Sequence, residues 1–163
     1  MRFILGLINL FKRMKKLILA AIFCMLATAT FAQNNGLGFR VGSGAELQYE
    51  RYFNSGNVLK LNAGLYDYSG NYFGTIIYDW DCFTWENWTP KAGDWFFNAG
   101  VGASFGTWKS DFNVGFLGDV AFGIHFKGAP ISLSVDYRPV FLLLHNCWDA
   151  TFGSVGLNCI FRF

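Results

Sequence analysis

Proline, charge and long apolar runs are all scarce in this chain of 163 residues. It has 3 prolines, and 15% of its residues are charged, compared with about 25% in an ordinary soluble domain. After residue 32, no segment approaches the roughly 20 consecutive apolar residues that a membrane-spanning helix requires. A disordered chain, a coiled coil and a typical nucleic-acid-binding protein are therefore excluded.

Aromatic residues and glycine are abundant instead. Aromatic residues make up 20% of the chain, which also has 19 glycines, and the apolar residues are dispersed rather than clustered. The length is that of one domain. This composition indicates a β-protein with an apolar outer surface.

The first 32 residues form a secretory signal peptide by their charge and hydropathy. They hold five basic and no acidic residues, an apolar run from Leu17 to Ala27, and small residues leading to Ala32. A run of this length is too short for a membrane anchor. We expect cleavage after Ala32, which leaves residues 33–163 as a single mature domain. The remaining chain has 8 basic and 11 acidic residues, so no basic face for nucleic acid is expected.

Alternation of apolar and polar residues runs through the rest of the chain. It is clearest from Phe112 to Phe126, where even positions are apolar or aromatic and nearly all odd positions are polar or small. A period of two indicates a β-strand, and no helical stripe fits it. The same pattern, with turn residues between segments, predicts eight strands: 36–42, 45–53, 58–67, 71–81, 94–107, 111–127, 130–144 and 151–163.

The size of the apolar side chains determines which face of the sheet points into the barrel. An eight-stranded barrel has an interior just wide enough for side chains, so large aromatic residues on every strand would overfill it. Apolar residues outside and polar residues inside are the arrangement of an outer-membrane barrel. We therefore predict an all-β, eight-stranded, antiparallel, up-and-down transmembrane β-barrel. A soluble periplasmic ligand-binding barrel of the lipocalin type is the alternative.

The last strand ends the chain with Phe161-Arg162-Phe163. With the leader, the eight alternating segments and the stretches beginning at Trp95 and Ala129, the chain resembles small eight-stranded outer-membrane proteins of the OmpA/OmpX type from Bacteroidetes. The resemblance implies a monomer in the cell outer membrane, surrounded by lipid and lipopolysaccharide. It also implies that Phe161 and Phe163 act as the signal for the barrel-assembly machinery. Such barrels share no single activity, so a structural or surface-interaction role is expected.

Charged residues share the inward parity of the predicted strands. A buried charge must be paired or hydrated, so we expect an ion-pair network that plugs the lumen, with Asp136 paired to Arg162. Asp79 and His125 have the same parity. A narrow polar conduit is the alternative. The predicted network consists of Arg40, Glu46, Glu50, Lys60, Asp119, Asp136, Arg138 and Arg162.

No catalytic or cofactor-binding set is evident in the sequence. Neither His125 nor His145 has a serine at the spacing of outer-membrane lipid A deacylases, and no cluster has metal-ligand spacing. We expect a non-enzymatic protein without a cofactor, and keep a lipid A-modifying enzyme as the competing class. The inward parity of Val140, Leu142 and Leu144 is the residue pattern that favours this alternative, because it would line an acyl-chain pocket.

Three cysteines follow the predicted leader. The strand order places Cys82 and Cys147 at opposite ends of the barrel and Cys159 on the outer face across from Cys82. A disulfide needs Cα atoms within about 7 Å, so we expect three free thiols.

Overall fold

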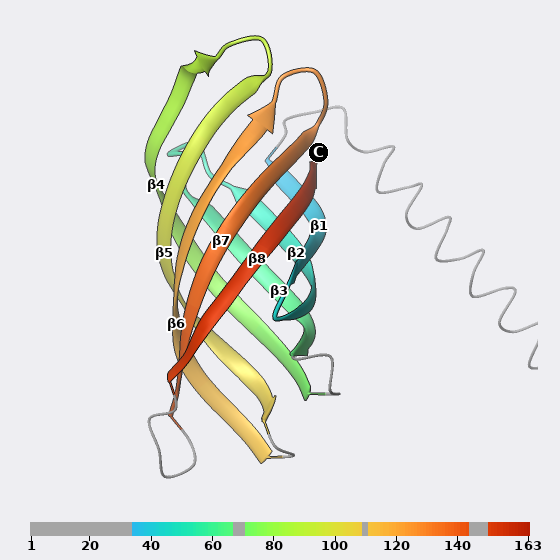
Figure 1. Cartoon of the computed structure of the whole chain (residues 1–163), viewed down its shortest axis with the longest axis vertical. Helices are drawn as coiled ribbons and strands as arrows, with labels where there is room; N and C mark the ends of the chain where they lie inside the picture. Colours follow the sequence, from blue (N-terminus) through green and yellow to red (C-terminus); the bar gives the residue numbers. More distant parts are fainter. Residues whose placement is uncertain (1–33, 67–70, 109–110, 144–149) are drawn as a thin grey trace, which may run out of the picture. The chain divides into compact units, whose positions relative to one another are not determined.

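A computed structural model describes residues 34–66, 71–108, 111–143 and 150–163, and these residues form a closed β-barrel (Figure 1). The predicted signal peptide and Cys147 lie outside the described residues. No described helix is long and apolar enough to span a membrane. The barrel has eight strands: β1 (Asn35–Gly42), β2 (Gly44–Tyr52), β3 (Val58–Tyr66), β4 (Asn71–Thr89), β5 (Gly93–Trp108), β6 (Asp111–Phe126), β7 (Ile131–Leu142) and β8 (Ala150–Arg162).

Each strand pairs antiparallel with the next one in the chain, and β8 pairs with β1 to close the barrel. At the closing seam, Phe39 of β1 lies opposite Cys159 of β8. Closure gives every strand a hydrogen-bonded partner strand on both sides, which the edge strands of an open sheet lack. The predicted fold class, an all-β eight-stranded antiparallel up-and-down barrel, is confirmed.

The predicted strand limits agree with the structure to within two residues, except for β4. We expected this strand to end at residue 81, but it continues to Thr89. The register with β5 shifts between Asp81 and Phe83, which leaves Cys82 as an extra residue. Such a bulge interrupts the period of two, so the alternation that marks the strand breaks down at this point.

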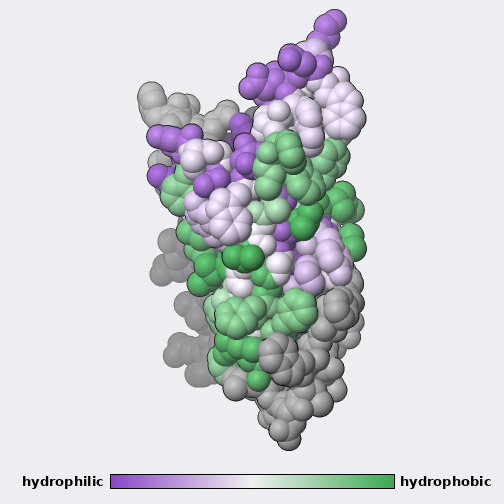
Figure 2. Space-filling view, turned by 90° about the vertical axis from the view of Figure 1, so that its left-hand side faces the viewer, coloured by the Kyte–Doolittle hydropathy of each residue, from purple (hydrophilic) through white to green (hydrophobic). Residues whose placement is uncertain are grey.

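The two faces of the barrel wall differ as the parity predicted. Side chains of opposite polarity alternate along β6, where Val120 is 41% exposed and Asp119 is 1% exposed. Figure 2 shows one side of the barrel, with hydrophobic residues over the middle of the wall and hydrophilic residues gathered toward the upper end. Cys82 and Cys159 are free and exposed, as predicted for these two cysteines.

Gly156 makes the closing seam possible. It pairs with Gly42 of β1 and with Asp136 of β7. A Cβ atom at this position would lie 2.5 Å from Cζ of Arg40. The missing side chain therefore leaves the space that the Arg40 guanidinium group occupies.

We expect Gly156→Val to destabilise the barrel, because the new side chain must displace a buried guanidinium group. Overpacking of this kind typically costs about 1–3 kcal/mol. Urea titration of the folded barrel measures the effect. Gly128→Val is the matched control, because nothing lies within 4 Å of a Cβ at Gly128; equal stability of the two variants would contradict the account of the seam.

Candidate functional site: a buried charge network in the lumen

Arg40 of β1 joins three strands inside the barrel. Its Nη1 lies 2.6 Å from Oε1 of Glu46, and its Nη2 lies 2.7 Å from Oδ1 of Asp136. Its Nε also donates to Asp136, and Nη2 donates to the carbonyl oxygen of Ser154 at 3.0 Å. The guanidinium group thus bridges β2, β7 and β8 from a position that is 1% exposed.

Arg138 of β7 binds the same two carboxylates from the other side. It lies 3.1 Å from Oε2 of Glu46 and 3.0 Å from Oδ2 of Asp136. Its Nε donates to Oδ1 of Asp119 at 3.1 Å. Two arginines and two acids therefore form a closed ring of ion pairs. All of these contacts except Arg138–Asp136 are also charge-assisted hydrogen bonds, which are stronger than bonds between neutral groups.

Lys60 of β3 extends the network to β4 and β6. Its Nζ lies 2.7 Å from Oδ2 of Asp119 and also contacts Asp79. Asp79 is fully buried, and its Oδ1 has no hydrogen-bond partner in the described part of the chain. Gly100 lies opposite Asp79 on β5, and a Cβ there would lie 2.1 Å from that oxygen.

The sequence-based network and the observed one overlap but differ. Ion pairs directly join Arg40, Glu46, Lys60, Asp119, Asp136 and Arg138 with each other. Asp79, which was not assigned to the network, belongs to it.

Glu50 connects to the network through Gln48 rather than through a cation. Its Oε1 accepts a hydrogen bond from Gln48 Nε2 at 2.6 Å, and the Gln48 oxygen accepts one from Arg138 at 3.3 Å. The hydroxyl of Tyr52 also donates to Glu50.

Arg162 lies away from Asp136, its expected partner. Its Cζ is 5.9 Å from the centre of the Tyr52 ring, near the end of the barrel where β8 finishes. The register explains the difference, because Asp136 lies opposite Gly156 and not opposite Arg162. Arg40 reaches Asp136 from β1 across the glycine.

Acidic groups outnumber cations in the lumen of the described barrel. Five buried carboxyl groups, those of Glu46, Glu50, Asp79, Asp119 and Asp136, share three buried cations, Arg40, Lys60 and Arg138. An uncompensated charge in a low-dielectric interior is costly. The carboxyl group with the fewest partners, that of Asp79, is thus the least favourable member of the set.

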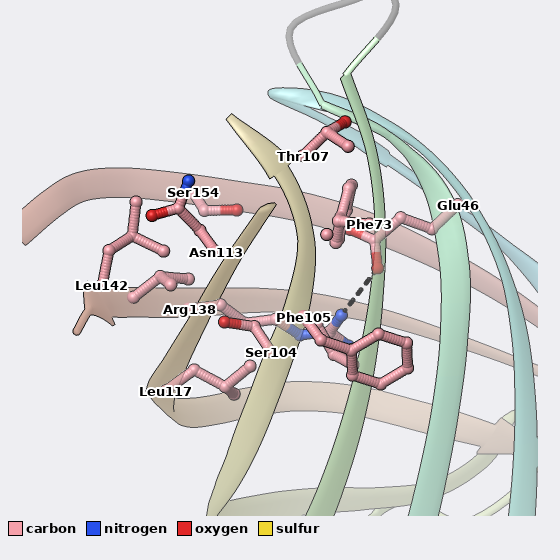
Figure 3. A pocket seen from close by; sticks show the side chains of 13 residues that line it. Glu46, Phe73, Ser104, Phe105, Thr107, Asn113, Leu117, Arg138, Leu142 and Ser154 are labelled. Carbon is pink, nitrogen blue, oxygen red and sulfur yellow. Dashed lines mark hydrogen bonds and ion pairs between the residues drawn. The ribbon is translucent and has the colours of Figure 1, made fainter. Parts of the chain in front are cut away.

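A cavity of about 70 Å³ lies beside the network, toward the end of the barrel where β5 ends and β6 begins (Figure 3). Its lining includes Arg138, Glu46, Leu117, Val140 and Leu142. The position of Val140 and Leu142 in this lining agrees with the inward direction predicted for them. Ligand pockets typically enclose about 300–1,000 Å³. The cavity is too small for a ligand of that size.

Sequence reasoning missed a contact between His125 and Ser132. Nδ1 of His125 lies 2.6 Å from Oγ of Ser132, because the two residues are opposite each other on β6 and β7. The imidazole stacks on Phe96 at a centroid distance of 4.3 Å, and Ser132 is 3% exposed. The strand register was the signal that could have revealed the pair. Among the described residues, no three His, Cys, Asp or Glu side chains are grouped to hold a metal ion.

The chain matches no protein-family model, and no curated protein or solved structure is significantly similar to it. The functional argument therefore depends on the barrel and its two faces.

We expect Asp136→Ala to lower the free energy of unfolding by about 3–5 kcal/mol, because Arg40 and Arg138 both lose a buried partner. A double-mutant cycle with Arg40→Met should show that the two losses are not additive. Asp94→Ala is the control, since its ion pair with Lys127 is at the surface, with side chains 30% and 46% exposed. Such pairs contribute about 0–1 kcal/mol. Additive effects would show that Arg40 and Asp136 are not coupled.

We expect the two aspartates that contact Lys60 to respond differently to neutralisation. Asp79→Asn removes one of the excess acidic groups and should cost little stability or increase it. Asp119→Asn removes a negative charge that both Lys60 and Arg138 contact and should be clearly destabilising. Chemical denaturation of the two variants in parallel tests this, and equal losses would contradict the charge imbalance described above.

Proposed function

We propose that this protein is an integral outer-membrane β-barrel whose lumen is plugged by the charge network, with a structural or surface-interaction role and no catalytic activity. The observation that carries the proposal is the inversion of polarity across the wall. Outside, large apolar side chains such as Phe39, Phe116 and Leu157 are 60–64% exposed, while inside, charged side chains are buried.

An apolar outer wall is unfavourable in water and favourable in lipid. Monomeric soluble proteins rarely expose contiguous apolar patches larger than a few hundred Å². A closed barrel also satisfies its backbone hydrogen bonds internally, which the hydrocarbon core of a membrane requires. These two features support the membrane barrel over the soluble ligand-binding barrel.

Plugging is supported by the geometry of the lumen. The ion pairs connect side chains from β1, β2, β3, β4, β6 and β7 across the interior. A barrel of eight strands is too narrow for a water-filled channel. We expect planar-bilayer recordings of the reconstituted protein to show no steady single-channel currents.

The non-enzymatic role is supported by the surroundings of the His125–Ser132 pair. The serine hydroxyl is buried and the imidazole is stacked on Phe96. A substrate carbonyl cannot approach Ser132 Oγ without moving these groups. Mass spectra of lipid A from cells with and without the gene test the competing lipid A-modifying activity, which predicts a change in acylation.

The rest of the proposal concerns export, assembly and surroundings. The leader at residues 1–32 would direct the chain to the envelope. Phe161 in β8 and Phe163 directly after the strand would be read by the barrel-assembly machinery. We place the barrel as a monomer among outer-membrane lipid and lipopolysaccharide. Its membership in an OmpA/OmpX-like group remains part of this proposal.

Val120→Arg tests the membrane location directly. In lipid, an arginine at the middle of the outer wall should cost about 2–4 kcal/mol of unfolding free energy. In a soluble barrel the same change at a 41% exposed position should be nearly neutral. Refolding titrations in phospholipid vesicles give the value, with Ser55→Arg in the exposed turn between β2 and β3 as the control. A Val120→Arg barrel as stable as the parent would count against membrane insertion.

A further inference from the structure

The part of β4 beyond Asp81 forms a hairpin with β5, and no strand of the described residues pairs with β4 there on its other side. Pairing between β3 and β4 starts at Val58 and Asp79, so the residues beyond Asp81 pair with β5 alone. The bulge at Cys82 resets the alternation, and Phe83 then lies opposite Phe97.

Six aromatic rings meet on the outer side of this hairpin and the adjoining β6. We define the hairpin aromatic cluster as Phe83, Trp85, Trp88, Trp95, Phe97 and Phe122. The ring centres of Phe83 and Trp85 are 5.8 Å apart, and those of Trp88 and Trp95 are 5.3 Å apart. Trp95 stacks on Phe122 at 5.2 Å, which makes the cluster continuous with the apolar wall.

The cluster combines exposed apolar rings with unused hydrogen-bond donors. Phe83 is 61% exposed and Trp88 is 65% exposed. Trp95 donates its indole N–H to Thr89 at 2.7 Å, whereas no described residue accepts the indole N–H of Trp85 or Trp88. Exposed indoles of this kind favour the boundary between hydrocarbon and lipid headgroups, where the ring is in an apolar medium and the N–H meets acceptors.

The described tryptophans occupy one sector of the barrel rather than a ring around it. Every tryptophan whose side chain is described, at positions 80, 85, 88 and 95, lies on β4 or β5. Near the same end of the barrel, on the seam of β1 and β2, the polar residues Asn35 and Arg51 lie opposite each other and are joined by a hydrogen bond of 2.8 Å.

We propose that the hairpin aromatic cluster is a one-sided anchor that binds the headgroup boundary of a phospholipid leaflet, on the side of the membrane where β1 begins and β8 ends. This inference rests on the proposed membrane location. The continuity of the cluster with the outer wall through Phe122 identifies lipid as its occupant. Glu86 and Asn87, which are exposed between the two outer tryptophans, would face the headgroups and water.

Fluorescence quenching by brominated phospholipids tests the proposal. The full chain is reconstituted in phosphatidylcholine vesicles whose acyl chains carry bromine at shallow, middle or deep positions. One variant keeps Trp88 and has phenylalanine at its other tryptophan positions. The matched variant has phenylalanine at all of them and carries Val120→Trp. We expect Trp88 to be quenched most by shallow bromine and the tryptophan at position 120 most by deep bromine.

The two variants separate failure of the anchor from failure of the membrane location. Deep quenching at position 120, with no quenching of Trp88 by any brominated lipid, overturns the anchor and leaves the membrane barrel standing. If Trp88 is then also shielded from acrylamide, protein rather than lipid covers the cluster. Quenching of neither tryptophan overturns both proposals. If the multiple replacements prevent folding, the difference in quenching between the parent and Trp88→Phe isolates the same residue.

Discussion

Buried carboxylates inside the barrel require cations, and much of the architecture follows from this constraint. Glu46 and Asp136 lie on strands that are not neighbours, and each binds both Arg40 and Arg138. A charge pair in a low-dielectric interior is strong only when its geometry and hydrogen bonds are complete. The network therefore couples the register of separate strands, and a shift of one strand by a single residue would move its charges to the apolar face.

Glycine makes room for these charges in a narrow barrel. Gly156 leaves space for Arg40 at the seam, and Gly100 leaves space for Asp79 on the other side of the lumen. Because the charged side chains fill the narrow interior, the bulky aromatic and aliphatic side chains lie on the outer face. The small interior volume of an eight-stranded barrel thus accounts for both the polar interior and the apolar exterior. Together these two features support the proposed location in a membrane.

The alternation of residues was sufficient to predict the fold class, the limits of every strand except β4, and the face on which the charges of the network lie. It could not predict the partners of those charges, because pairing depends on the register of the closed barrel. Arg40 and Asp136 are 96 positions apart in the chain and meet only because β8 closes on β1. The extension of β4 was missed for a local reason, since the bulge at Cys82 breaks the period of two. The His125–Ser132 contact was missed because it is formed across strands and leaves no spacing signature.

Nuclear Overhauser effects between lipid and protein methyl groups in phospholipid nanodiscs test the central claim most directly. The account predicts strong contacts from acyl-chain protons to Val120, Leu133 and Leu157, which are 41%, 43% and 64% exposed on the outer wall. It predicts no such contacts to Ile77 and Leu117, which are buried in the lumen. Contacts to water rather than lipid at the outer methyl groups, or contacts to lipid at the two lumenal residues, would contradict it.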